Sequence, residues 1–194
     1  ITILGFEASN KRFDLMVRNI SIANYAYFAN YYQKEQNTGL INLTQGTLST
    51  KNKIVGHLNL YSDFTVQVPA GNTPIRVPLL YTRQRLAFEG LFFKNLHLST
   101  GLDVRYNTPY KANHYSPIPG RFFPQDSIRI NNLPTLNAFC NFTIKKFTLF
   151  LMVENLNTLE YNEGLGFTRN NFTAPYYPSP GFILRLAVKW EMVN

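Results

Sequence analysis

Three side chains between residues 96 and 107 are of the types that form a hydrolase triad, namely His97, Ser99 and Asp103. All three alternate onto one face of an extended segment. Positions two apart on a strand lie about 6.6 Å apart along it, which is too far for the direct hydrogen bonds that a triad needs. The sequence therefore predicts that the protein is not an enzyme, and it indicates no catalytic residue.

Metal and cofactor chemistry has equally little support in the sequence. Cys140 is the only cysteine, so neither an intramolecular disulfide nor a cysteine-cluster metal site is available. His57 and His97 belong to different predicted strands and would approach each other only if the strand between them allowed it, and His114 falls in a loop. We expect no bound metal and no cofactor.

Charged residues on the predicted strands are the strongest candidates for function. They are expected to line the interior of a barrel, and they are Arg83, Arg85, Glu89, Asp103, Arg105, Arg185, Lys189 and Glu191. A row of arginines across a pore favours anions. The acids beside them instead predict internal salt bridges that stiffen the wall, and we favour this second interpretation.

The elements that must position these residues are strands, and the last one is the clearest. From Phe182 to Met192 every even position is apolar, whereas the odd positions include Arg185 and Lys189. A period of two is typical of a strand with one apolar and one charged face. We expect the apolar face to contact lipid and the strand to pair with the segment from Phe147 to Asn155.

About nine such strands of roughly ten residues follow one another, with no helical period between them. Within Phe13–Phe28 the apolar phase changes, which predicts a bulge near Arg18 and Asn19. Short connections are expected at residues 9–12, 51–53, 93–95 and 145–146, and long ones at 29–39, 69–78, 107–134 and 155–180. The sequence contains no run of eighteen apolar residues, so it predicts no transmembrane helix.

Alternating short and long connections are typical of a transmembrane barrel, with short periplasmic turns and long extracellular loops. The predicted fold class is therefore an all-β, antiparallel transmembrane β-barrel with up-and-down meander connectivity. We expect it in the bacterial outer membrane, with outer-membrane lipids as partners and the C-terminus on the periplasmic side. Bacterial barrels have even strand numbers, so nine strands predict the C-terminal portion of a larger single barrel domain, with strands missing upstream of residue 1.

The net charge of +8 would ordinarily suggest nucleic acid as a partner. The predicted barrel interior is nearly neutral, however, and most of the positive charge falls on the short turns. These basic turn residues are Lys11, Arg12, Lys51, Lys53, Lys94, Lys145 and Lys146. The pattern argues against nucleic acid. It is typical of a rim that contacts anionic headgroups or other outer-membrane or periplasmic proteins, and equally of lysine as a common turn residue.

Aromatic residues gather at both ends of the predicted strands. Phe92, Phe147 and Trp190 lie beside the short turns, whereas Tyr81, Tyr106 and Tyr161 lie near the long loops. Two such belts are typical of the interface girdles of outer-membrane barrels.

From residue 81 onward the chain resembles a known family. The segments that carry the resemblance are "LFFKNL", "GLDVRYNTPYKANHYSP", "PTLNAFCNFTIKKFTLFLMVENLN" and "YYPSPGFILRLAVKW". They are similar to the C-terminal part of the putative porins of Bacteroidetes outer membranes, and the pattern extends over most of residues 25–194. The resemblance implies an outer-membrane porin that passes small solutes. Similar endings occur in TonB-dependent receptors, and a non-transporting barrel subunit of a multiprotein complex is a third alternative.

Overall fold

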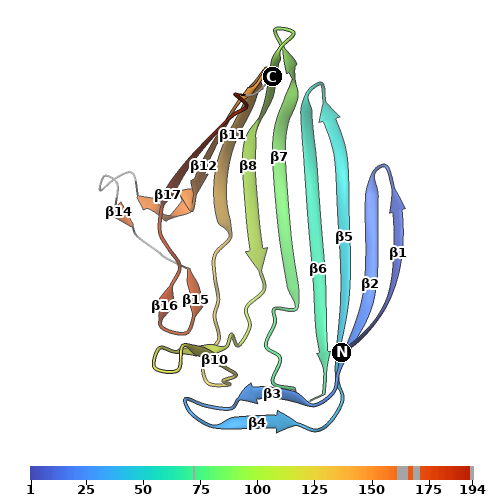
Figure 1. Ribbon diagram of the computed structural model, residues 1–194, viewed down its shortest axis with the longest axis vertical. Helices are drawn as coiled ribbons and strands as arrows, with labels where there is room; N and C mark the ends of the chain where they lie inside the picture. Colours follow the sequence, from blue (N-terminus) through green and yellow to red (C-terminus); the bar gives the residue numbers. More distant parts are fainter. Residues whose placement is uncertain (72, 161–165, 168–170, 193–194) are drawn as a thin grey trace.

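Nine long strands form one antiparallel sheet in the computed structural model of the chain (Figure 1). The structure describes residues 1–71, 73–160, 166–167 and 171–192. In sheet order the strands are β1 (Thr2–Asn10), β2 (Phe13–Ile22), β5 (Ile41–Val55), β6 (Leu58–Ala70), β7 (Leu80–Phe92), β8 (Leu96–Asn107), β11 (Thr135–Ile144), β12 (Phe147–Glu154) and β17 (Ile183–Trp190). Their order in the sheet follows the chain, which confirms the predicted meander.

Short turns join the strands at one end of the sheet, and long connections join them at the other (Figure 1). The end of β17 lies at the short-turn end, where the Glu191 amide donates to the Lys146 carbonyl oxygen. Residues 147–154 pair with residues 183–190, as the alternation predicted. In the described part of the chain no ladder joins β1 to β17, so the sheet has two free edges.

Shorter elements occupy the long connections. They are β3 (Tyr25–Phe28), β4 (Lys34–Asn37), β9 (His114–Ser116), β10 (Arg121–Phe123), the 3₁₀ turn η1 (Leu156–Thr158), β13 (Leu159–Glu160), β14 (Gly166–Phe167), β15 (Phe172–Ala174) and β16 (Tyr177–Pro178). The hairpin of β3 and β4 lies across the lower end of the sheet in Figure 1. No helix among the described residues is long and apolar enough to cross a membrane.

The register separates the sheet into an apolar and a polar face. None of the described strand positions on the apolar face carries a charged residue. Many of its large side chains are exposed, with Leu4 at 71%, Phe6 at 65% and Leu186 at 64%. Some of the polar side chains that do occur there bond to one another, as when Ser21 Oγ donates to Asn42 Oδ1 at 2.7 Å. A wide, exposed apolar face of this kind is typical of a surface that contacts lipid or another protein.

The predicted bulge near Arg18 and Asn19 is wrong. The ladders of β2 with β1 and with β5 run through both residues without a shift of register. The phase change in the sequence instead puts Ile20 and Ile22 on the polar face. Hydrogen-bonded partners on both sides of β2 hold its register against the local apolar pattern.

The predicted short connection at residues 51–53 is also wrong. Strand β5 continues to Val55, and the turn falls at Gly56 and His57, where Gly56 has a φ of +53°. Glycine adopts this left-handed conformation without steric cost, so the chain reverses there. Lys51 and Lys53 are consequently not rim residues; they alternate onto the polar face opposite Tyr61 and Asn59.

Gly101 marks a place where β7 and β8 approach each other unusually closely. A Cβ at this position would lie 1.9 Å from the Leu86 carbonyl oxygen, and its register partner Ala87 is fully buried. We expect Gly101→Ala to destabilise the protein by roughly 1–3 kcal/mol, the usual range for overpacking. Urea unfolding of the detergent-solubilised protein measures the change.

Gly46→Ala is the matched control, because a Cβ at Gly46 on strand β5 meets no atom within 4 Å. We expect this variant to be neutral or slightly stabilising. Equal destabilisation by both substitutions would contradict the steric explanation.

Candidate functional site

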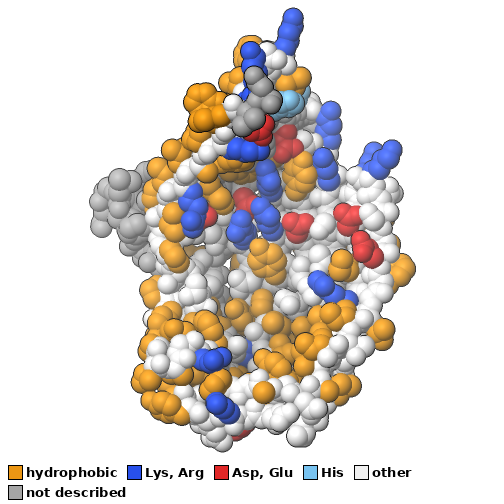
Figure 2. Space-filling view, viewed as in Figure 1, with side chains coloured by type: hydrophobic (Ala, Val, Ile, Leu, Met, Phe, Trp, Pro, Cys, Tyr) orange, Lys and Arg blue, Asp and Glu red, His pale blue; other side chains and the backbone are white. Residues whose placement is uncertain are grey.

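Two adjacent rows of register partners cross the polar face and bring together four of the predicted charged residues, Arg83, Arg85, Asp103 and Arg105. We call the two rows the charged belt. One row contains Asp14, Ser49, Asp63, Arg83 and Arg105, and the other contains Lys51, Tyr61, Arg85, Asp103 and Asn137. Figure 2 shows basic and acidic side chains mixed across the upper half of this view, above a mainly hydrophobic region near the long connections.

An ion triplet lies at the centre of the charged belt. Asp103 is only 2% exposed, and its two carboxylate oxygens accept hydrogen bonds from Arg83 Nε at 2.6 Å and from Arg105 Nε at 2.7 Å. The two arginine side chains remain 37% and 40% exposed. The acid is therefore covered by two bases, and the triplet presents a net positive charge on the polar face.

A second cluster surrounds Glu89 on the same face. Its carboxylate accepts hydrogen bonds from the Tyr61 hydroxyl at 2.6 Å, from Ser99 Oγ at 2.9 Å and from Asn59 Nδ2 at 3.2 Å. Arg85 Nη2 lies 3.8 Å from Glu89 Oε1, and its guanidinium stacks 4.1 Å from the centre of the Phe139 ring. These contacts hold Arg85 in a defined position instead of leaving it free in solvent.

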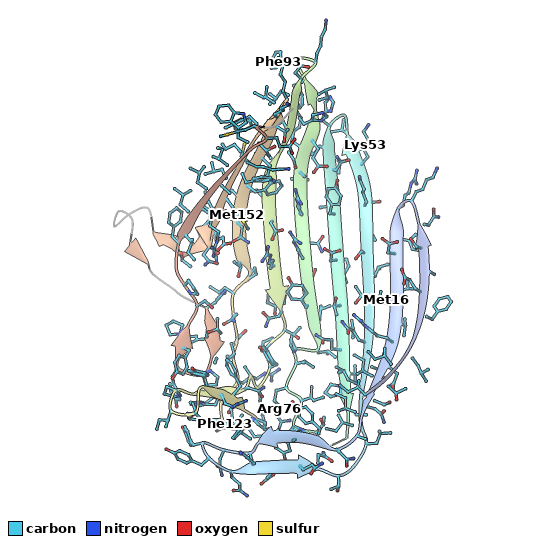
Figure 3. The ribbon with its side chains drawn as sticks, in the orientation of Figure 1. Met16, Lys53, Arg76, Phe93, Phe123 and Met152 are labelled. Atoms are coloured by element: carbon cyan, nitrogen blue, oxygen red, sulfur yellow. The ribbon has the colours of Figure 1, made fainter. Side chains whose placement is uncertain are left out.

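The remaining predicted interior residues lie on and beyond the last strand. Arg185 on β17 makes a two-pronged bond to Glu154 on β12, with N···O distances of 3.0 and 3.1 Å. Lys189 bonds Glu191 at 2.7 Å, and Glu191 lies just past the end of β17. Met152 stands opposite Arg185 in the ladder and is labelled in Figure 3. The predicted salt bridges therefore form on the polar face, and Arg83, Arg85, Arg105 and Arg185 each take part in one.

Aromatic contacts on the apolar face occur at the short-turn end. Phe147 meets Trp190 edge to face, with ring centres 6.4 Å apart. Phe92 stacks on Phe88, and the His57 ring lies 5.1 Å from Phe92, above Gly90. His57 is thus an apolar-face residue and cannot meet His97 across the polar face. This arrangement depends on the turn at Gly56, whereas the sequence pattern predicts that turn at residues 51–53.

Two of the three tyrosines predicted for the loop-end girdle point in opposite directions. Tyr106 alternates onto the apolar face opposite Thr82, whereas Tyr81 shares the polar face with Arg83. A single outward-facing belt therefore cannot contain both side chains. Tyr161 lies outside the described residues.

The arrangement gives no support to a hydrolytic triad among His97, Ser99 and Asp103. Ser99 donates to Glu89, and Asp103 accepts from two arginines, so neither is available to a histidine. Within the residues that the structure describes, no three His, Cys, Asp or Glu side chains are grouped to hold a metal ion. Cys140 is a free thiol that alternates onto the apolar face.

Lys51 and Tyr61 are members of the charged belt that the sequence analysis missed. The Lys51 ammonium lies 5.3 Å from the centre of the Tyr61 ring, and the Arg85 guanidinium lies 5.8 Å from the same ring. Lys51 was assigned to a turn because the lysines interrupt the apolar pattern there. Gly56 is the signal in the sequence that could have located the turn correctly, since glycine is the residue that most readily adopts a left-handed turn.

The long connections fold against one another at the other end of the sheet. Tyr31 packs on Phe123 with ring centres 4.9 Å apart, and His114 stacks on Phe123 at 5.1 Å. Tyr176, from the last connection, lies 5.7 Å from His114. Phe123, at the centre of this loop cluster, is labelled in Figure 3. The loop cluster joins three connections that are far apart in the sequence.

Asp126 joins its own connection, between β8 and β11, to the connection between β6 and β7. It bonds Arg76 at 2.9 Å and Lys111 at 3.2 Å, and these bonds, that from Lys111 first, hold the pKa of the Asp126 carboxyl below its usual value. A lowered pKa in the folded state means that the contact stabilises the loops at neutral pH and is lost as the carboxyl protonates, below about pH 4.

We therefore expect faster amide hydrogen exchange in residues 108–134 at pH 3 than at pH 6, after correction for the intrinsic rates. The measurement is mass-spectrometric hydrogen exchange. Asp126→Asn is expected to show the faster corrected exchange at both pH values, because an amide has no charge to lose. An Asp126→Asn protein that responded to pH as strongly as the unmodified protein would assign the effect to another group.

Comparison with known proteins identifies a family for the whole chain. A family model described as putative porin matches residues 1–194. Among solved structures, the FrpB iron transporter from Neisseria meningitidis (F3-3 variant) aligns with a TM-score of 0.58 and 14% sequence identity. The alignment covers 97% of this chain and 30% of that transporter, so the chain spans less than a third of its length. At this identity the likeness concerns the fold alone. No curated protein matches the chain.

Proposed function

The chain belongs to the putative porin family, and on that premise we propose that it forms part of an outer-membrane β-barrel through which small hydrophilic solutes diffuse. The observation that carries the proposal is the division of the sheet into two faces. One face is free of charged residues over the described strands, and the other carries the charged belt. A lipid-facing exterior and a polar interior are what a porin wall requires.

The two free edges support the view that this sheet is one part of a closed wall. Unpaired edge strands cannot lie in lipid, because their backbone N–H and C=O groups would lack partners. Further strands of the whole protein would pair with β1 and with β17 and would close the barrel. The resulting interior would be lined by the charged belt, with Arg83, Arg85, Arg105 and Arg185 facing the pore.

We orient the barrel with its short turns and the end of β17 in the periplasm and its long connections outside. Outer-membrane barrels have this arrangement of short and long loops. The basic turn residues at the periplasmic rim, Lys11, Arg12, Lys94, Lys145 and Lys146, would then lie where anionic headgroups or a periplasmic protein could contact them. Trp190 and Phe147 would lie at the inner interface.

The experiment that tests the proposal is conductance across a planar bilayer by the whole protein purified in detergent. A diffusion porin is expected to give stable, stepwise current at constant voltage. Absence of any current from folded protein would overturn the porin assignment.

The fold similarity to an iron transporter favours one second candidate, the barrel of an energised receptor. A receptor barrel closed by a plug would carry no steady current. Removal of a plug segment from the whole protein would then open a large one. Steady current from the unmodified protein would exclude this alternative.

A further inference from the structure

We infer that the basic part of the charged belt binds small oxyanions, carboxylates or phosphates, on their way through the barrel. The inference rests on the proposed function, because it names the class of solute for the same interior surface. It also resolves the two interpretations of the arginines. They form salt bridges, as favoured from the sequence, and they nevertheless present positive charge to the pore.

Base and acid are unequally buried in three of the ion pairs on the polar face. In the Asp103 triplet the acid side chain is 3% exposed, against 37% and 40% for Arg83 and Arg105. In the Arg185–Glu154 pair the base is 60% exposed and the acid 24%. The carboxylates lie beneath the guanidinium groups, so a solute at the surface meets the bases first.

Most hydrogen-bond donors of Arg83 and Arg105 are not used within the described part of the chain. Each guanidinium has five N–H groups, and both Arg83 and Arg105 use only the Nε–H toward Asp103. Within the described part of the chain, the Nη groups of these two arginines make no hydrogen bond. Arg83 and Arg105 are direct register partners on β7 and β8, and both guanidinium groups lie against the Asp103 carboxylate. Such forked donors match the geometry of carboxylate and phosphate oxygens.

A hollow of about 360 Å³ lies beside Arg83, toward the short-turn end of the polar face. Basic side chains outnumber acidic ones in its lining, and the basic ones are Lys11, Arg12, Lys51, Arg83 and Arg85. Two acids also line it, namely Asp14 on β2 and Asp63 on β6. The hollow is thus positive overall and has room for a small oxyanion.

Lys51 is a base of this hollow that no carboxylate of the described residues neutralises. It makes no salt bridge with a carboxylate among the described residues, and its ammonium lies over the Tyr61 ring. Lys53 is two residues further along the same strand and the same face, is exposed like Lys51, and is not part of the hollow. The two lysines therefore form a matched pair for experiment.

The test is calorimetric titration of the whole detergent-solubilised protein with inorganic phosphate and, separately, with succinate, both at low ionic strength. We expect saturable binding of at least one probe. Lys51→Gln should weaken this binding about fivefold. The attraction between two unit charges about 4 Å apart in water corresponds to about this factor in the dissociation constant. Arg83→Gln should weaken it at least as much, and Lys53→Gln should leave it unchanged.

Two results would overturn the inference, namely no binding of either probe by the folded protein, or equal weakening by Lys51→Gln and Lys53→Gln. The second result would mean that diffuse positive charge, and not this hollow, attracts the anion. Preference for phosphate over succinate, or the reverse, identifies which oxyanion the site takes.

The reversal potential across a planar bilayer separates this inference from the proposed function. A reversal potential that shows anion preference supports both the oxyanion site and the porin assignment, provided that it moves toward zero in Lys51→Gln but not in Lys53→Gln. Current with cation preference supports the porin assignment and overturns the oxyanion site. Phosphate binding without any current retains the site and overturns the porin.

Discussion

Replacing Asp103 by alanine is expected to lower the free energy of unfolding by about 3 kcal/mol, at the lower end of the range for breaking a buried ion pair. The substitution leaves Arg83 and Arg105 side by side without the carboxylate that both contact. The lower end applies because the two guanidiniums are 37% and 40% exposed and retain some water. Equilibrium unfolding in urea, followed by tryptophan fluorescence of the protein in detergent, measures the loss.

Asp63→Asn provides the control for this prediction. Asp63 lies on the same face, opposite Arg83 in the ladder, but makes no salt bridge among the described residues. We expect it to change stability by less than about 0.5 kcal/mol. The loss of stability in Asp103→Asn should lie between the losses in Asp103→Ala and Asp63→Asn, because the amide oxygen can still accept a hydrogen bond from one arginine. Equal midpoints for Asp103→Ala and Asp63→Asn would show that the triplet does not stabilise the wall.

Leu186→Arg is expected to cost roughly 2–4 kcal/mol when the protein is folded in a bilayer, if Leu186 lies near its midplane. Leu186 is in the middle of β17 on the charge-free face and is 64% exposed. Lipid would be the medium in contact with the new guanidinium. Unfolding in urea from phospholipid vesicles is the appropriate measurement, because a detergent micelle adapts more easily to a charge.

Ala187→Arg is the matched variant, one residue along the same strand and on the opposite face. The polar face already carries Arg185 and Lys189, so this arginine is expected to cost less than 1 kcal/mol through weak repulsion at the edge of the belt. Similar costs for the two arginines would refute the assignment of lipid to one face and water to the other.

Most of the strand pattern could be predicted because alternation is a local property. A strand turns successive side chains to opposite faces, so the distribution of Leu184, Arg185 and Leu186 in the sequence already separates the two faces. The predicted pairing of the last two long strands is confirmed by their ladder. The nine-strand meander is confirmed as well, since sequential strands joined by tight turns pair with their neighbours.

Turn positions were less predictable, because they depend on backbone conformation more than on polarity. Two lysines in a row of polar residues suggested a turn at residues 51–53, but the chain reverses at Gly56. That shift of a few residues transfers Lys51 from the rim to the charged belt and His57 from the polar to the apolar face. Likewise, the apolar run at Ile20 and Ile22 suggested a bulge that the ladders on both sides of β2 exclude.

The sequence by itself determined that this chain forms strands with a charge-free face, and that arginines and acids share the other face. Only the tertiary structure decided which acid each arginine meets and which of the two is buried. Asp103 lies beneath Arg83 and Arg105 because β7 and β8 pair in one register and approach closely at Gly101. Register and burial arise from contacts between strands that are distant along the chain, and a local pattern does not contain them.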